Sequence, residues 1–116
     1  MADQIQNYDF DDGKFGNTYD AVIFTLNDDA ANSLTDAKIY MQLRKRPGGN
    51  IAAEFSTEND KMEINSEFVF SLKSQIIDVV ADTYDYDILI VFADGTRGTY
   101  IGGHWTIHPA ITYKKI

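Results

Sequence analysis

Residues 84–112 read YDYDILIVFADGTRGTYIGGHWTIHPAIT, and this stretch decides the fold. Tyr84, Tyr86 and Ile88 alternate with two aspartates, which is the period of two expected of a strand. Asp94-Gly95 then gives a strong hairpin signal, because glycine adopts the positive φ that a tight turn demands. The stretch therefore predicts two antiparallel strands joined by a turn at Gly95.

The return strand, residues 96–112, is too long to run straight. Gly102 and Gly103 lie in its middle, where we expect a bulge or a bend. Pro109 has no N–H to donate to a ladder, so it is expected at a strand end or on an edge. Gly95, Gly102 and Gly103 are thus predicted to shape the fold together with the tyrosines of the preceding strand.

Earlier segments supply the rest of an all-β fold. Residues 37–46, AKIYMQLRKR, have the cleanest alternation in the chain, and residues 19–26, YDAVIFTL, form a second run that precedes a turn signal at residues 27–29. Shorter apolar runs follow the Pro47-Gly48 turn. Residues 72–80 carry apolar side chains at helical spacing and predict a short helical turn that crosses between layers. We predict an antiparallel β-sandwich of about seven to eight strands, with residues 1–14 as an N-terminal segment or arm and residues 15–116 as one domain.

Composition excludes several classes of function. The chain has 116 residues, no cysteine and a formal net charge of −8. Without cysteine there are no disulfides, thiol nucleophiles or cysteine-based zinc sites. A strongly negative chain has the wrong sign for binding a phosphate backbone. No apolar run is long enough for a membrane span, and residues 1–12 lack the pattern of a secretion signal. We expect no nucleic acid, membrane or cofactor as a partner.

Residues that carry chemistry are few. His104 and His108 share a strand face but stand roughly 13 Å apart at about 3.3 Å per residue, too far for one metal ion. The aspartate clusters match no calcium-loop pattern, and aspartates at turns hydrogen-bond their own backbone. No nucleophile elbow or phosphate loop occurs. The sequence therefore predicts a protein that is not an enzyme, with no catalytic or metal-binding residues.

A first resemblance involves the tyrosines at the start of the opening stretch. Residues 81–86, ADTYDY, resemble the start of the sixth strand in immunoglobulin-like domains. In those domains a tyrosine hydroxyl pins the preceding corner to the backbone. Either Tyr84 or Tyr86 is suited to that role. The cysteine that often follows is missing, so an antibody-type domain is not implied.

A second resemblance extends over residues 15–113. The order of segments is similar to the immunoglobulin-like N-terminal module of phage baseplate upper proteins and related virion proteins of tailed phages. The segments are LTDA before KIYMQLR, YDYDI, DGT, IGG and the closing IT at residues 111–112. In the baseplate proteins further domains follow this module, whereas this sequence ends at Ile116. The receptor-binding function of the longer proteins is therefore not carried over.

The resemblance implies an immunoglobulin-like sandwich that is a structural part of a virion, made in the host bacterial cytoplasm and docked on a tail or baseplate, collar or capsid framework. Its partners would be other virion proteins and copies of itself. Docking energy usually concentrates in a few aromatic or arginine anchors. The interface residues expected here are Tyr40, Arg44, Arg46, Tyr100 and Trp105. The alternative is a carbohydrate-binding or host-surface adhesion module that uses exposed aromatic rings, although a core position is the plainer interpretation of Trp105.

Overall fold

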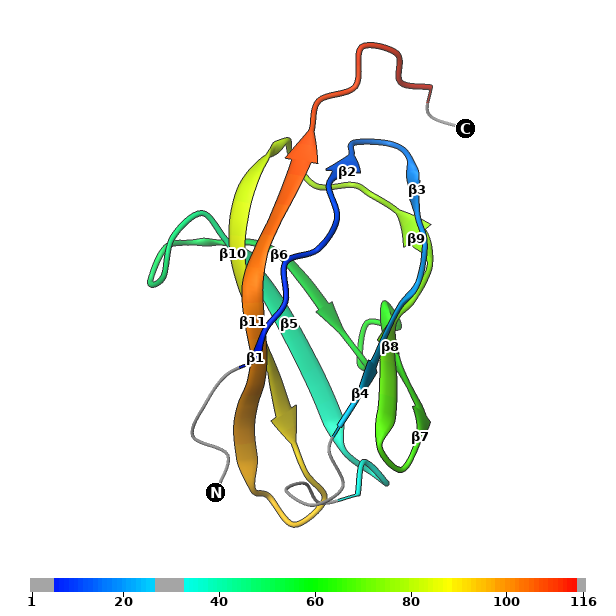
Figure 1. Cartoon of the computed structure of the whole chain (residues 1–116), viewed down its shortest axis with the longest axis vertical. Helices are drawn as coiled ribbons and strands as arrows, with labels where there is room; N and C mark the ends of the chain where they lie inside the picture. Colours follow the sequence, from blue (N-terminus) through cyan, green and yellow to red (C-terminus); the bar gives the residue numbers. More distant parts are fainter. Residues whose placement is uncertain (1–5, 27–32, 115–116) are drawn as a thin grey trace.

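All regular secondary structure in the described residues, 6–26 and 33–114 of this computed structural model, is β-strand (Figure 1). The strands are β1 (Gln6–Asn7), β2 (Gly13–Lys14), β3 (Thr18–Tyr19), β4 (Val22–Thr25), β5 (Lys38–Arg44), β6 (Ile51–Ser56), β7 (Met62–Ser66), β8 (Val69–Leu72), β9 (Gln75–Ile76), β10 (Asp82–Val91) and β11 (Arg97–His108). The expected turn at residues 27–29 falls outside the described residues. The all-β prediction is confirmed.

The strands form two main layers. One sheet has the order β1-β11-β10-β5-β6, with β2 also paired to β11. The other has the order β4-β8-β7, and the short pair β3-β9 continues beside it. Figure 1 shows the β10-β11-β5 layer facing the β4-β8-β7 layer across the core. The arrangement is a sandwich, as the sequence predicts.

Alternation along β5 and β10 fills the space between the layers. Ile39, Met41 and Leu43 of β5 are fully buried, as are Ile88 and Ile90 of β10. Because neighbouring side chains on a strand point to opposite faces, the residues that alternate with these buried ones form the outer face of the sheet. The other fully buried large side chains are those of Trp105, Tyr84, Phe70, Leu34, Met62, Leu72 and Ile107.

The hairpin between β10 and β11 forms at the expected turn. Gly95 has φ +90°, and the amide of Thr96 donates to the carboxylate of Asp94 at 2.8 Å. The register shift lies elsewhere than expected: Ile88 pairs with Ile101 and Leu89 with Thr99, so Tyr100 is the extra residue. Of the bulge or bend expected at Gly102-Gly103, the bulge is therefore absent, since Gly102 and Gly103 pair in regular register with Asp87 and Tyr86. β11 ends at His108, immediately before Pro109.

Gly103 has a different role, which depends on residues far away in the sequence. A Cβ atom at Gly103 would lie 2.2 Å from the carbonyl oxygen of Tyr8. Glycine is needed because the N-terminal segment runs parallel to β11 at this point, with the amide of Tyr8 bonded to the carbonyl of Gly102 at 2.9 Å. Phe10, from the segment that the sequence analysis set apart as residues 1–14, is 4% exposed in the core.

The helical turn predicted for residues 72–80 is wrong. This stretch contains the end of β8, the short strand β9 and an extended connection. Ile77 and Val79 are buried while Ile76 and Val80 are exposed, which is the alternation of an extended chain and not of a helix. β-branched residues favour the extended form. The described residues contain no helix long and apolar enough to cross a membrane.

Both predicted tyrosines of β10 are buried and anchor backbone. The hydroxyl of Tyr84 donates to the carbonyl of Val80, and the hydroxyl of Tyr86 donates to the carbonyl of Tyr8. The sequence allowed either tyrosine to make the contact with the preceding corner, and Tyr84 is the one that does. Tyr86 joins β10 to the N-terminal segment instead.

Candidate functional site

The five residues predicted to form an interface do not gather in one place. Tyr40 and Arg44 lie on the outer face of β5, and Tyr100 is the bulged residue of β11, with its ring centroid 6.2 Å from that of Phe92. Arg46 is exposed in the turn after β5. The side chain of Arg44 is hydrogen-bonded within its own hairpin. Its guanidinium donates to the carbonyl of Gly49 and, at 2.9 Å, to the side-chain oxygen of Gln42.

Trp105 is not a surface residue. Its side chain is 1% exposed, and its ring packs between Phe10, Tyr19 and Phe55 at centroid distances of 4.9, 4.8 and 5.8 Å. The interface assignment for this residue is wrong, and the core interpretation is confirmed. Its indole N–H is buried and has no hydrogen-bond acceptor among the described residues.

A shallow hollow lies on the outer face of the larger sheet. Its volume is about 390 Å³, and polar side chains surround Tyr40 there, with Leu89 as the other large apolar residue of the lining. The polar residues of the lining are Gln42, Glu54, Asp87, Arg97 and Thr99. This hollow combines one aromatic ring with carboxylates and a guanidinium, a set that hydrogen-bonds hydroxylated ligands.

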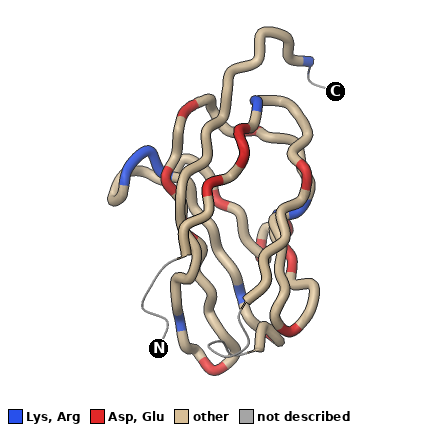
Figure 2. Tube along the Cα trace, in the orientation of Figure 1, with Lys and Arg blue, Asp and Glu red and all other residues tan. Residues whose placement is uncertain are grey.

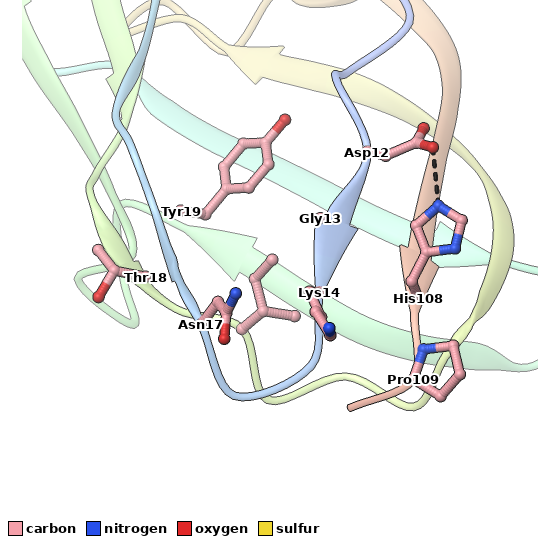
Figure 3. Close-up of a pocket in the computed structure, with 9 residues that line it drawn as sticks. Asp12, Gly13, Lys14, Asn17, Thr18, Tyr19, His108 and Pro109 are labelled. Atoms are coloured by element: carbon pink, nitrogen blue, oxygen red, sulfur yellow. Dashed lines mark hydrogen bonds and ion pairs between the residues drawn. The ribbon is translucent and has the colours of Figure 1, made fainter. Parts of the chain in front are cut away.

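Each histidine pairs with a carboxylate. His104 Nδ1 lies 2.8 Å from Asp85, and His108 Nε2 lies 2.7 Å from Asp12. Figure 3 shows the second pair at the rim of a hollow of about 500 Å³, whose lining also includes Lys14 and, on the opposite side, Asn17. Within residues 6–26 and 33–114, no three histidine or acidic side chains come close enough together to hold a metal ion. The two histidines are surface residues, each hydrogen-bonded to its own aspartate.

A third surface, which the sequence analysis did not identify, lies along β4. Two hollows of about 200 and 510 Å³ meet there, and both are lined by Tyr8, Val22 and Ile23. We call the two together the β4 groove. Phe24 and Ile101 line one end, and Asp11 and Asp20 line the other. Ile23 is 67% exposed.

The backbone of β4 is open toward this groove. The amide of Leu26 donates to the carbonyl of Phe68 at 2.7 Å, which makes these two residues a hydrogen-bonded pair. Hydrogen-bonded and non-bonded pairs alternate along an antiparallel ladder. Ile23 and Thr25 therefore turn their N–H and C=O groups away from β8, and β8 is the only strand that pairs with β4 in the described part of the chain.

Comparisons with known proteins add little to this description. No family model and no curated protein matches the sequence. Among solved structures, the crystal structure of CopC from Methylosinus trichosporium OB3b is similar to this chain at a TM-score of 0.46 and 9% identity, with 89% of each chain covered. A similarity at this level carries no argument about function.

Proposed function

We propose that this chain is a non-enzymatic structural protein of a tailed-phage virion, and that it acts by docking to other virion proteins and to copies of itself. The observation that carries the docking function is the open β4 edge with the exposed Ile23 beside it. An uncovered edge bordered by apolar side chains is a template for pairing with another chain. The virion setting comes from the sequence resemblance over residues 15–113.

We also propose that the sandwich is of the immunoglobulin-like type. The tyrosine contact from Tyr84 to the carbonyl of Val80, four residues earlier, has the geometry of the tyrosine corner of that fold. The sheet orders β11-β10-β5-β6 and β4-β8-β7 match an assignment of β10 and β11 as the last two strands of the sandwich. This assignment supports the resemblance to the baseplate module.

The virion proposal is tested by the composition of purified particles. A phage that encodes this chain is grown and purified through a density gradient, and its proteins are quantified by mass spectrometry. The chain is expected at a fixed stoichiometry to the major tail or capsid protein, in intact particles and after removal of loosely bound protein by salt. If it stays in the lysate and never co-purifies with particles, the proposal is wrong.

A carbohydrate-binding function is the second candidate, and the hollow at Tyr40 is the observation that favours it. Trp105 is buried and contributes no sugar platform, so Tyr40 and the polar residues around it would have to do so. A glycan array with the wild-type chain and the Tyr40→Ala and Tyr100→Ala variants tests this function. Binding that Tyr40→Ala removes and Tyr100→Ala retains would favour it over docking.

A further inference from the structure

The edge strand β4 lacks the protection that exposed edges normally carry. Natural sheets block their free edges with lysine or other charged residues, or with proline. β4 reads VIFT and has none of these, whereas the edge strands β6 and β7 each include a glutamate, Glu54 and Glu63. The outward backbone groups of Ile23 and Thr25 thus remain available to another strand. Such an edge can accept a strand from another segment or molecule.

The chain itself contains a segment with the complementary chemistry. Residues 109–114, PAITYK, follow β11, and we call them the C-terminal segment. Ile111 is 100% exposed, and Lys114 lies close after it. Alternation along an extended chain would place Ile111 and Tyr113 on one face and Lys114 on the other. The segment therefore combines an apolar face with a basic one.

The β4 groove has the matching pattern. Its apolar part is formed by Tyr8, Val22 and Ile23, and its acidic end by Asp11 and Asp20. None of the described residues that line the two hollows is basic. Figure 2 shows acidic residues along the N-terminal segment that borders this side of the sandwich. A strand that carries an isoleucine or tyrosine and a lysine offers an apolar side chain to the apolar part of the groove and a positive charge to its acidic end.

The segment does not reach the groove of its own molecule in this structure. The ring of Tyr113 packs on Phe15, with centroids 5.0 Å apart, and a Cβ at Gly16 would collide with the same ring. Figure 1 shows the chain leaving the sandwich beyond β2 and the top of β3, away from β4. Ile111, held at that end, is fully exposed. A second molecule can therefore approach it.

We propose that the C-terminal segment of one copy, through Ile111 to Lys114, adds as an edge strand to β4 of a second copy. Main-chain hydrogen bonds to Ile23 and Thr25 supply the affinity, and contacts of the incoming side chains with the groove supply the specificity. The donor and acceptor surfaces differ, so the contact is head-to-tail and generates a ring or a filament. This inference rests on the proposed docking function and specifies the contact between copies.

The test measures self-association of the full chain by sedimentation velocity over a range of protein concentrations. Thr25→Pro disables the acceptor, because Thr25 donates nothing to β8 and proline is tolerated where the N–H faces outward. Ile111→Asp disables the donor. Each variant alone should associate at least about tenfold more weakly than the wild type, as expected when one central anchor is lost. Circular dichroism of each variant checks that the sandwich remains folded.

Mixing the two variants gives the decisive result. Thr25→Pro keeps an intact segment and Ile111→Asp keeps an intact groove, so the mixture should form a one-to-one complex that grows no further. Ile23→Lys and Lys114→Glu serve as a second acceptor and donor pair if a proline variant fails to fold. Ile51→Lys, an exposed isoleucine on β6 away from the groove, is the matched control and should associate like the wild type.

Several results would overturn the inference. A wild-type chain that stays monomeric at every concentration, a donor variant that associates normally, or a mixture with no one-to-one complex would each do so. A chain that stays monomeric would also remove docking to copies of itself from the proposed function, whereas the virion setting depends on recovery from particles and is tested separately. A chain that assembles head-to-tail in solution and is absent from particles would instead remove the virion proposal and leave this inference standing.

Discussion

The hydroxyl of Tyr84 donates a hydrogen bond to the backbone carbonyl of Val80, four residues earlier in the chain. The contact ties the first part of β10 to the connection that arrives from β9. The Tyr84 ring is 1% exposed, so packing holds the hydroxyl in position. One side chain thus fixes where the chain leaves one layer of the sandwich and enters the other.

Replacing Tyr84 by phenylalanine should therefore lower the free energy of unfolding by about 1 kcal/mol, the usual net value of one such hydrogen bond. The ring and its packing remain, so the spectroscopic signature of the fold should not change. Urea unfolding followed by tryptophan fluorescence measures the effect. Tyr100→Phe is the control, because no hydrogen bond of its hydroxyl is found in the described structure. Equal stability of the Tyr84→Phe variant and the wild type would show that the corner contact contributes nothing.

The local features of the fold were predictable, and the long-range ones were not. The alternating run at residues 37–46 was identified as a strand and contains β5, and Asp94-Gly95 was identified as a turn, because alternation and turn chemistry depend on neighbouring residues. Gly103 was identified as a residue that shapes the fold, but the reason was not predictable, because it is the carbonyl of Tyr8, far away in the sequence. Residues 72–80 were misread because a short run of apolar residues fits either period.

The same limit applies to the functional surfaces. Trp105 was placed both in the core and at an interface, and only the packing of Phe10 and Tyr19 around its ring decides between these positions. The β4 groove depends on which strand pairs with β4 and which does not. Period-two alternation marks Ile23 as facing away from Phe24, but it does not show that no strand covers the edge. That information lies in the sheet order.

Gly103→Ala should detach the N-terminal segment from β11 without unfolding the sandwich. The added Cβ would lie 2.2 Å from the carbonyl oxygen of Tyr8, so the segment has to move away. Hydrogen exchange measures this, because the amides of Tyr8 and Phe10 each donate to β11 at 2.9 Å. Their exchange should accelerate at least about tenfold while core amides keep their protection.

Gly95→Ala is the matched control for that experiment. Gly95 has φ +90° and open space where a Cβ would be added, so alanine strains the backbone without displacing any neighbour. We expect it to cost about 1–3 kcal/mol of global stability and to raise exchange throughout the hairpin. If Gly103→Ala produced the same global pattern, the close approach of the two segments would not be the reason for glycine at that position.

Stability should decline at alkaline pH because buried tyrosines cannot ionise without loss of packing. Burial raises the pKa of Tyr86 above its ordinary value of 10.0, and the pKa values of Tyr19 and Tyr84 are raised chiefly for the same reason. Above about pH 10 the unfolded chain loses these protons first, so unfolding is favoured as the pH rises toward the folded values. The stabilising contribution is complete below that pH.

Urea titrations at about pH 8 and about pH 11 measure this decline. Tyr86→Phe should lower the slope of stability against pH by up to about 1.4 kcal/mol per pH unit, because one ionisable phenol is removed. Tyr113→Phe is the control, since that side chain is about half exposed. An unchanged slope in Tyr86→Phe would mean that Tyr86 ionises as readily in the folded chain as in the unfolded one.

Amide exchange along β4 should alternate from residue to residue. Phe24 lies in a hydrogen-bonded pair with Phe70, by the alternation that starts at Leu26, so its amide should be protected. Ile23 and Thr25 point their amides into the β4 groove and should exchange at least about tenfold faster than Phe24 in the dilute chain. Nuclear magnetic resonance of the labelled protein resolves these residues one by one.

The same measurement at high protein concentration tests whether self-association covers the open edge of β4. If a segment of a second copy pairs with β4, the amides of Ile23 and Thr25 gain acceptors, and their exchange should slow as association proceeds. Phe24 already has its acceptor on β8, so its exchange should change little. Protection of Ile23 and Thr25 in the dilute monomer would contradict the open edge, whereas their continued fast exchange in the associated state would place the contact between copies on another surface.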